Sequence, residues 1–229
     1  MALIDKASLL MVPSTYEAGK LYNVLPSGNR APDNKGGAGY DQTRADFDFD
    51  RGSNAAATRI GSDGLLKKYQ ENKLPYSNQF DTTWGNTNSS ETSGQIGYDG
   101  TNDAWLLTKN GVTGRIIQTF SANGVQTFSV YAKADNLNWL LLMATTSAGD
   151  RTSYFDLSTG IIGSGTNIDS KIESIGSGWY RCSITFSEST TGLRIYPADA
   201  NNDISGTSGS ILIQNAQLES GLVATDYLN

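Results

Sequence analysis

Residues 179–186 read WYRCSITF, and this stretch decides the fold. Apolar or aromatic side chains occupy every second position: Tyr180, Cys182, Ile184 and Phe186. The positions between them are Trp179, Arg181, Ser183 and Thr185. Because successive side chains of a strand point to opposite faces of a sheet, the alternation predicts a half-buried β-strand whose first set faces the core.

The same period of two recurs along the second half of the chain. In residues 127–133, Phe128, Val130 and Ala132 share one face, and Tyr131 lies on the other. We expect nine such strands, each bounded by Gly, Asn, Ser or Asp: Trp105–Lys109, Gly114–Phe120, Thr127–Lys133, Trp139–Thr145, Thr152–Leu157, Lys171–Ile175, Trp179–Phe186, Gly192–Tyr196 and Ser210–Gln217. Without convincing helices, they predict an all-β fold, an antiparallel β-sandwich. A jelly roll is the favoured topology, and an immunoglobulin-like sandwich is the alternative.

The composition supports this fold class and excludes several partners. Hydrophobic residues make up 38% of the 229 residues and charged residues only 17%, which suits neither a helical bundle nor a disordered chain. The net charge is −6 and no run of Lys or Arg is present, so we expect no nucleic-acid partner. No segment has the roughly 18 apolar residues of a membrane span. The start lacks a positively charged n-region, so we expect neither a signal peptide nor a membrane partner.

The domain organisation follows from where the strand pattern begins. Residues 1–80 are expected to form an extended N-terminal arm, and residues 81–229 the sandwich. The arm has an apolar docking patch of Leu9, Leu10, Met11 and Val12, followed by a long loop rich in Gly, Pro, Asn and Asp. Three short strands are expected after the patch: Lys20–Leu25, Phe47–Arg51 and Ala57–Ile60. Such an arm does not bury its own apolar residues, so we expect it to lie on another subunit or on the main domain.

Several short motifs follow one another in a specific order along most of the chain. Arg51, the run 57–60 and the pair 64–65 form the first, and YSNQFDTTW at 76–84 the second. FSVYAKA at 128–134, GWYRC at 178–182 and AQLESG at 216–221 complete the order. In this order the motifs resemble bacteriophage virion structural proteins of the tail-fibre and head-decoration family, which carry a carbohydrate-binding-like jelly-roll module. A further motif of that family is missing between the first two, and many relatives continue into a long distal part that this sequence does not contain.

The resemblance implies a non-enzymatic phage virion protein, assembled in the host cytoplasm and localised to the virion. The expected role is a surface decoration or knob, a collar, or a short-fibre or adaptor subunit, docked through its N-terminal arm. The alternative is a carbohydrate-binding host-attachment module of a tail fibre. The expected partners are other capsid or tail subunits and further copies of the chain, with a trimer as one option. A host surface glycan is the partner that the alternative requires.

Catalytic chemistry has few residues to draw on. The chain has no His, which excludes Ser-His-Asp and Cys-His arrangements and His-ligated metal sites. Its one cysteine, Cys182, excludes an intrachain disulfide and reads as a small buried hydrophobe. A polysaccharide-degrading enzyme needs only two suitably spaced carboxylates, but most acids stand in turns rich in Asn and Gly. We therefore expect no enzyme activity and no cofactor.

One loop resembles a calcium site. In DANNDISG at 199–206, Asp199, Asn201 and Asp203 occupy the first, third and fifth positions of a calcium-loop pattern. Ile204 stands where that pattern needs Gly, and Ser210 where it needs Glu, so an EF-hand is excluded. A looser oxygen site is the remaining metal hypothesis, and an ordinary turn between strands is the alternative.

Aromatic and basic side chains on the outward positions suggest a contact surface. Tyr131, Trp179 and Arg181 are predicted to face away from the core, with four further residues expected nearby: Trp139, Tyr154, Arg194 and Tyr196. Aromatic faces stack on sugar rings while Arg bonds hydroxyl groups, which gives the glycan interpretation. Packing against a covering loop or a neighbouring subunit is the other interpretation, and the more common use of such residues.

Overall fold

The computed structural model describes residues 71–228 in full and, before them, five short strands between residues 13 and 68. The chain divides into two compact units, residues 1–69 and 70–229, whereas the sequence places the boundary between residues 80 and 81. Among the described residues, no helix is long and apolar enough to cross a membrane.

The first unit contains two small antiparallel sheets. Strands β1 (Pro13–Glu17), β2 (Lys20–Asn23) and β3 (Phe47–Asp48) form one, and β4 (Thr58–Ile60) and β5 (Leu66–Lys68) form the other. Strands β2, β3 and β4 overlap the three short strands expected from the sequence. The predicted docking residues lie outside the described residues: Leu9, Leu10, Met11 and Val12.

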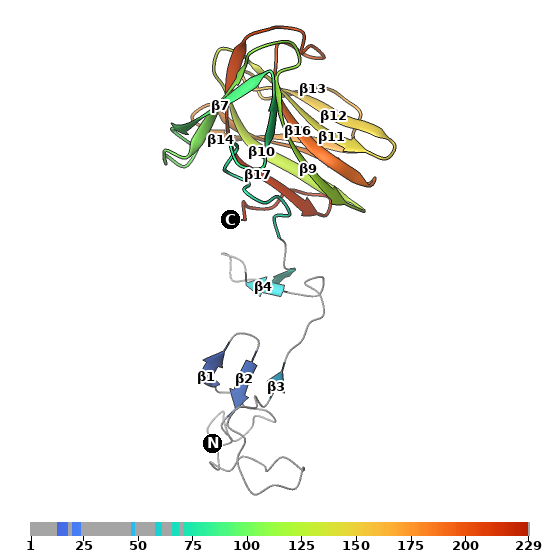
Figure 1. The fold of residues 1–229 in the computed structure, drawn as a ribbon. Coiled ribbons are helices and arrows are strands. Elements are labelled where there is room, and N and C mark those ends of the chain that lie inside the picture. Colours follow the sequence, from blue (N-terminus) through green and yellow to red (C-terminus); the bar gives the residue numbers. More distant parts are fainter. Residues whose placement is uncertain are drawn as a thin grey trace, which may run out of the picture. The chain divides into compact units, whose positions relative to one another are not determined.

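The second unit is a sandwich of two six-stranded antiparallel sheets, which Figure 1 shows as two layers. Sheet 1 has the order β14-β15-β10-β17-β8-β7, and sheet 2 the order β13-β12-β11-β16-β9-β6. The strands of sheet 1 are β7 (Ser89–Gln95), β8 (Ala104–Lys109), β10 (Gln126–Ala134), β14 (Asp169–Gly176), β15 (Trp179–Phe186) and β17 (Gly209–Ser220). Those of sheet 2 are β6 (Gly85–Thr87), β9 (Arg115–Ala122), β11 (Trp139–Thr146), β12 (Gly149–Asp156), β13 (Ile161–Gly165) and β16 (Thr190–Ala198). The predicted all-β sandwich is confirmed.

The strand pairing is that of a jelly roll. Eight strands form two four-stranded arrays, β8-β17-β10-β15 and β9-β16-β11-β12. In chain order these strands are β8, β9, β10, β11, β12, β15, β16 and β17. Strand β8 pairs with β17, β9 pairs with β16, and β10 pairs with both β17 and β15. The chain is thus folded back on itself as one long hairpin that is wrapped into two sheets. This topology confirms the jelly roll over the immunoglobulin-like alternative.

All nine predicted strands are present, with ends that differ by a few residues. Three further strands, β6, β7 and β13, were not predicted. Their sequences, GNT, SSETSGQ and IIGSG, lack an alternation of apolar and polar residues. All three lie at sheet edges, where a strand pairs on one side only and its side chains have little core to fill. Their backbone pairing is therefore invisible to a search for hydrophobic periodicity.

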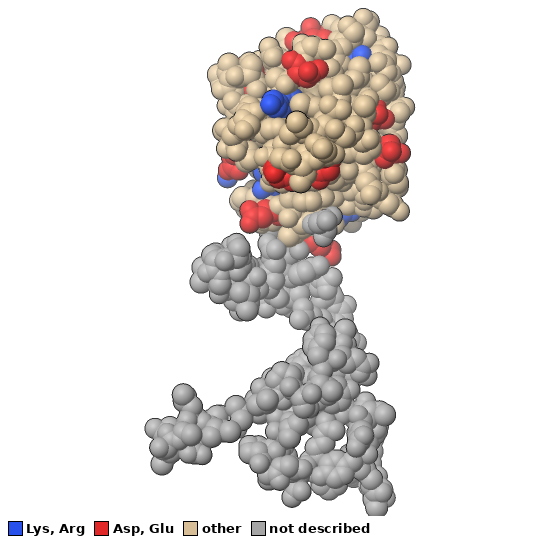
Figure 2. Space-filling view, turned by 90° about the vertical axis from the view of Figure 1, so that its left-hand side faces the viewer, with Lys and Arg blue, Asp and Glu red and all other residues tan. Residues whose placement is uncertain are grey.

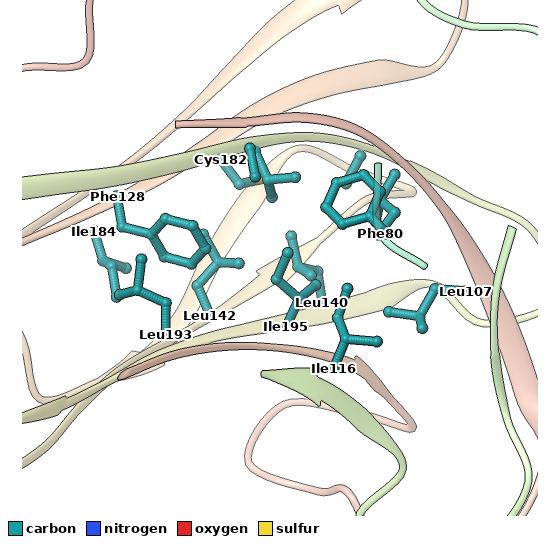
Figure 3. Packing of buried hydrophobic residues seen from close by; sticks show 14 of the residues in the cluster. Phe80, Leu107, Ile116, Phe128, Leu140, Leu142, Cys182, Ile184, Leu193 and Ile195 are labelled. Atoms are coloured by element: carbon teal, nitrogen blue, oxygen red, sulfur yellow. The ribbon is translucent and has the colours of Figure 1, made fainter. Parts of the chain in front are cut away.

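The core lies between the two sheets, and all of its central side chains are inaccessible to solvent. Figure 3 shows Phe128 and Ile184 of sheet 1 facing Leu142 and Leu193 of sheet 2. Cys182 joins them as the small buried hydrophobe that the alternation predicts. The segment that precedes the sandwich fills one end of the core with three apolar side chains, those of Leu74, Phe80 and Trp84.

The predicted register of β15 is correct, but its other face is not open to solvent. Arg181, Ser183 and Thr185 all lie buried on the outer side of sheet 1. The residues that follow β17 cover them: Thr225 accepts a hydrogen bond from Arg181 through its carbonyl, and Gly221 accepts one from Thr127 Oγ1 at 2.8 Å. Alternation indicates which face a residue takes, whereas the cover comes from a segment far along the chain.

The core predicts unequal costs of substitution at buried and at exposed strand positions. Ile184→Ala and Phe186→Ala each remove a large, fully buried side chain and are expected to lower the free energy of unfolding by about 2–5 kcal/mol. Thr119→Ala, at an exposed position of β9, is the matched surface control and is expected to change it by less than about 0.5 kcal/mol. Urea unfolding of the three variants measures these values, and equal losses at all three positions would contradict the register.

Candidate functional site

The aromatic residues singled out in the sequence form two clusters, and these lie on opposite sheets. Tyr131 and Trp179, with Arg181, belong to the outer face of sheet 1, on β10 and β15. The second cluster belongs to the outer face of sheet 2, on β11, β12 and β16: Trp139, Tyr154, Arg194 and Tyr196. One contact surface therefore does not include both.

The cluster on sheet 1 is closed. The Tyr131 ring is stacked on the Tyr98 ring, with 4.0 Å between the two centroids. The Arg181 guanidinium also lies over the Tyr131 ring, 5.3 Å from its centroid. Trp179 is 2% exposed and meets Tyr98 edge-on. Tyr227 packs beside them and shares a 2.6 Å hydrogen bond with Ser77. Tyr131, Trp179 and Arg181 are thus covered by other parts of their own chain and offer no open surface.

Burial shifts the pKa values of the tyrosines in this cluster. It raises the pKa of Tyr131 to about 12, although the positive charge of Arg181 acts in the opposite direction. Burial also raises the pKa of Tyr227. The folded state therefore favours the protonated phenols, and the interior of this cluster is a poor place for charge.

The cluster on sheet 2 is partly open, and we call it the aromatic strip. Leu140, Leu142 and Ala144 of β11 point into the core, so the alternating residues Trp139, Leu141 and Met143 point outward. Across the sheet, Leu141 stands between Tyr154 of β12 and Tyr196 of β16, and Met143 between Thr152 and Arg194. Arg115 of β9 completes the strip. It comprises Arg115, Trp139, Leu141, Met143, Thr152, Tyr154, Arg194 and Tyr196.

Within the strip a buried floor supports half-exposed groups. Leu141, Tyr154 and Tyr196 are buried, whereas Trp139 and Met143 retain part of their surface. Tyr196 Oη and Arg194 Nη1 lie 3.8 Å and 3.0 Å from Met143 Sδ. Burial raises the pKa of Tyr154 and of Tyr196, so both phenols stay neutral around neutral pH. The floor is packed, and the groups above it that reach solvent are an indole, a thioether and two guanidinium groups.

Gly163 on the edge strand β13 allows the backbone of this strand to pack closely against Trp139, at one border of the strip. A Cβ atom at this glycine would lie 2.8 Å from Trp139 Cζ3 and 2.4 Å from Asn201 Oδ1. No larger residue fits there without displacing the indole ring. The glycine therefore lets β13 and the 199–206 loop close on one edge of Trp139 while its remaining surface stays accessible.

The calcium candidates are engaged with protein groups. Asp199 Oδ2 accepts a hydrogen bond from Lys109 Nζ at 2.5 Å, and the Lys109 side chain is fully buried. Asn201 Oδ1 accepts from the Ser164 amide at 2.8 Å, and Asp203 Oδ1 from the Ser205 amide at 2.9 Å. The three side chains thus serve different partners, and an ammonium group lies where a cation would meet Asp199. In the described part of the chain, no group of three or more acidic, Cys or His side chains is arranged to hold a metal.

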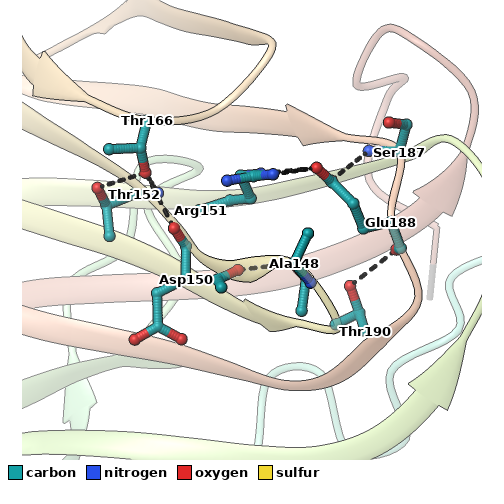
Figure 4. Close-up of polar contacts among 10 residues, drawn as sticks. Ala148, Asp150, Arg151, Thr152, Thr166, Ser187, Glu188 and Thr190 are labelled. Atoms are coloured by element: carbon teal, nitrogen blue, oxygen red, sulfur yellow. Dashed lines mark hydrogen bonds and ion pairs between the residues drawn. The ribbon is translucent and has the colours of Figure 1, made fainter.

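Another ion pair lies at the end of the sandwich. Arg151 of β12 is paired with Glu188, and Figure 4 shows the Asp150 carboxylate pointing away from this pair. The guanidinium keeps the pKa of Glu188 low through its hydrogen bonds. Glu188 also accepts the Ser187 amide at 3.1 Å. The charge of Arg151 is therefore satisfied within the protein, unlike that of a ligand-binding cation.

One pair of carboxylates lies close together in the loop before β8. Thr101 Oγ1 donates to Asp99 at 2.6 Å and also contacts Asp103, and Gln214 Nε2 contacts both. The hydrogen bond from Thr101 lowers the pKa of Asp99. A general acid for glycoside hydrolysis requires a raised pKa, so Asp99 does not have that property.

Sequence reasoning identified four members of the strip but missed the other four: Arg115, Leu141, Met143 and Thr152. Met143 carried a usable signal, because it shares the period of two with Trp139. Arg115 gave none, since its place beside Tyr196 depends on the pairing of β9 with β16, strands far apart in the sequence.

No family model matches the sequence, and no curated protein matches it. Among solved structures, the CBM22-1–GH10 modules of Clostridium thermocellum endo-1,4-β-D-xylanase 10B, complexed with xylohexaose, match 67% of this chain and 29% of that one, at 10% identity and a TM-score of 0.40. The enzymatically active domain of bacteriophage CBA120 tailspike protein 4 matches 64% and 21%, at 14% identity and a TM-score of 0.36. The catalytic domain of a GH87 α-1,3-glucanase, complexed with tetrasaccharides, matches 65% and 28%, at 13% identity and a TM-score of 0.33.

The chain spans less than a third of the length of each of these structures. The similarity is one of β-sandwich architecture, distant and shared with carbohydrate-active modules, one of them from a phage tailspike. At these identities and TM-scores it carries no argument about what this chain binds.

The Lys109–Asp199 pair makes a prediction about metal dependence. Asp199→Ala leaves a buried ammonium without its carboxylate and is expected to cost about 3–5 kcal/mol of unfolding free energy. Asp203→Ala, a neighbour whose carboxylate bonds a turn amide, is the control and is expected to cost less than about 1 kcal/mol. EDTA is expected to leave the melting temperature of the wild type unchanged. A fall in melting temperature with EDTA would instead indicate a bound cation in this loop.

The buried phenols make a prediction about alkaline stability. Their pKa is raised in the folded state, so their contribution is intact below the ordinary tyrosine pKa and is lost as pH rises through the folded value, about 12 for Tyr131. Urea unfolding at increasing alkaline pH should show this decline. Tyr131→Phe should make it shallower, and an unchanged slope in this variant would contradict the assignment.

Proposed function

We propose that residues 71–228 form a non-catalytic carbohydrate-binding module of a phage particle, which attaches the particle to a surface glycan. The observation that carries this proposal is the aromatic strip on sheet 2. It is a surface on which a partly exposed indole and partly exposed hydrogen-bond donors share the outer face of neighbouring strands. The order of motifs that resembles phage virion proteins supports the particle context.

The chemistry of the strip suits a sugar. A pyranose ring has an apolar face of C–H groups, which stacks on an indole, and a rim of hydroxyls, which needs directional partners. Trp139 and Met143 offer the apolar surface, while Arg194 and Thr152 stand on the strands at either side of Met143. Because the floor is packed, the site is already formed and little conformational entropy is lost on binding.

The acids around the strip support binding without hydrolysis. Asp150 and Asp156 both take the outward face of β12, but they stand at its two ends, roughly 20 Å apart for an extended strand. Glycosidases need two carboxyl groups separated by about 5–10 Å. Hydrogen bonds from Ser158 and Thr159 outweigh the effect of burial and lower the pKa of Asp156, which opposes a role as general acid.

The glycan proposal is tested with an array of bacterial surface polysaccharides and the full chain. Trp139→Ala should weaken binding at least tenfold, because it removes the indole but leaves the strand. The control is Tyr76→Asn, which removes an exposed aromatic side chain outside the strip. Asn is chosen because it tolerates the left-handed backbone conformation of this position. Equal weakening by both variants, or none by Trp139→Ala, would refute the strip as the binding surface.

A second candidate function is assembly, favoured by a different observation. Four isoleucines lie exposed on and between the edge strands β13 and β14: Ile161, Ile162, Ile168 and Ile175. Each of these strands pairs on one side only, so its free backbone groups can pair with the same strand of a second copy. We propose this edge as the contact between copies in the particle.

The assembly candidate predicts a concentration-dependent mass. Light scattering should show an oligomer that Ile161→Lys combined with Ile168→Lys converts to a monomer, since two charges at the edge oppose pairing. Val112→Lys, an exposed apolar position on another loop, is the control and should leave the mass unchanged. A wild type that remains monomeric at high concentration would exclude this edge as a contact between copies.

A further inference from the structure

The aromatic strip contains two guanidinium groups that the protein does not neutralise well. Arg115 lies over Tyr196, 5.6 Å from the ring centroid, and donates from Nη1 to the Thr113 carbonyl at 3.2 Å. Among the described residues no carboxylate forms an ion pair with it. Arg194 has one weak partner, Asp150, at 3.8 Å from Nη1 to Oδ2.

Three other cations of the described unit are used differently. Lys109 is paired with Asp199 at 2.5 Å, Arg151 with Glu188, and Arg181 is buried against the Thr225 carbonyl. The chain as a whole has a net charge of −6, and the face in Figure 2 shows scattered Asp and Glu with fewer Lys and Arg. Two underused guanidinium groups on one strip are therefore not a consequence of a generally basic surface.

The sheet brings the two side chains together. Arg194 of β16 stands opposite Ile117 of β9, and Arg115 is two residues from Ile117 on the same strand face. Arg115 and Arg194 are thus diagonal neighbours, whose Cβ atoms lie about 7–8 Å apart in such an arrangement. Arg194 Nη1 and Tyr196 Oη both contact Met143 Sδ, and the Arg115 guanidinium lies 5.6 Å from the centroid of the Tyr196 ring, so both arginines lie near Tyr196. Side chains as long as Arg reach a common anion from these positions.

We propose that the strip binds an acidic glycan, one whose sugars carry carboxylate groups, with Arg115 and Arg194 holding a carboxylate and Trp139 another ring of the same glycan. This inference rests on the proposed function and names its substrate class. Guanidinium groups bind carboxylates through paired, charge-assisted hydrogen bonds, which are stronger than those to neutral hydroxyls. The Arg194 side chain is 23% exposed, so part of it is accessible to a ligand.

Asp150 gives the proposal a second, opposite signature. Its side chain is 45% exposed, and its carboxylate lies 3.8 Å from the Arg194 guanidinium. Asp150 therefore competes with a ligand carboxylate for this guanidinium, and its negative charge repels the ligand. Removing this charge should strengthen acidic-glycan binding, whereas removing either arginine should weaken it. A purely structural role of these residues does not predict changes of opposite sign.

The experiment measures binding of the full chain to four polymers: polygalacturonate, alginate, hyaluronate and polysialic acid. Each is paired with its carboxyl-reduced form, which keeps the sugar backbone and loses the charge. At least one acidic polymer should bind at least tenfold more tightly than its reduced form. Arg115→Gln and Arg194→Gln should each remove that difference, and Asp150→Asn should increase it. Arg151→Gln, which removes a cation paired elsewhere, is the matched control and should have no effect. Circular dichroism verifies that each variant is folded.

The outcomes separate this inference from the proposed function. If a neutral polymer binds as well as its acidic form and binding depends on Trp139 but on neither arginine, the carbohydrate module stands and the acidic specificity is refuted. If no polymer binds, acidic or neutral, both are refuted. If dextran sulfate binds as tightly as the best uronate and Trp139→Ala has no effect on either, the attraction is one of bare charge, and the acidic-sugar site is refuted.

Discussion

The central strands of this sandwich are buried on both faces, and the rest of the structure depends on covering them. Strand β10 is buried at seven consecutive positions, and β11 alternates core leucines with outward residues that are themselves largely buried. A two-sheet sandwich buries one face of each sheet, so the outer faces need a further layer. On sheet 1 that layer comes from the residues after β17 and from Tyr98. On sheet 2 the cover is incomplete, because β13 and Ile204 close over one part of the strip and leave Trp139 and Met143 half-exposed.

The difference between the two outer faces explains why similar residues have different uses. Tyr131 and Arg181 on one face, and Tyr196 and Arg115 on the other, form the same kind of guanidinium–aromatic contact. The first pair is buried, and its arginine donates a hydrogen bond to the backbone carbonyl of Thr225. The second pair lies at a surface, and its charge is only partly satisfied. Both places have tyrosines, a tryptophan and an arginine, so it is the cover, rather than these residue types, that distinguishes the buried cluster on sheet 1 from the proposed binding surface on sheet 2.

Much of the fold could be predicted from the sequence, and less of the site. The period of two in residues 127–133 and 179–186 indicates both the strands and their inner faces, because it reflects local geometry alone. Three edge strands escaped prediction, since GNT, SSETSGQ and IIGSG pair through the backbone and have no apolar pattern. The arrangement of the sheets is not local either, which is why Tyr131 and Trp139 were grouped although they lie on opposite faces. Asp199 shows the same limit: its partner Lys109 is 90 positions away in the sequence.

The place of β17 in sheet 1 has a consequence for how the molecule acquires its structure. This twelve-residue strand lies between β8 and β10, and it is the last strand of the sandwich along the chain. Until it inserts, β8 and β10 have no bond to each other, and the inner edge of each presents unpaired amides and carbonyls. The sheet therefore closes in a single late step that joins segments about one hundred residues apart, and folds of this contact order acquire their structure slowly. A nascent molecule spends that interval with the inner edges of β8 and β10 unpaired, and such edges are open to association with other strands.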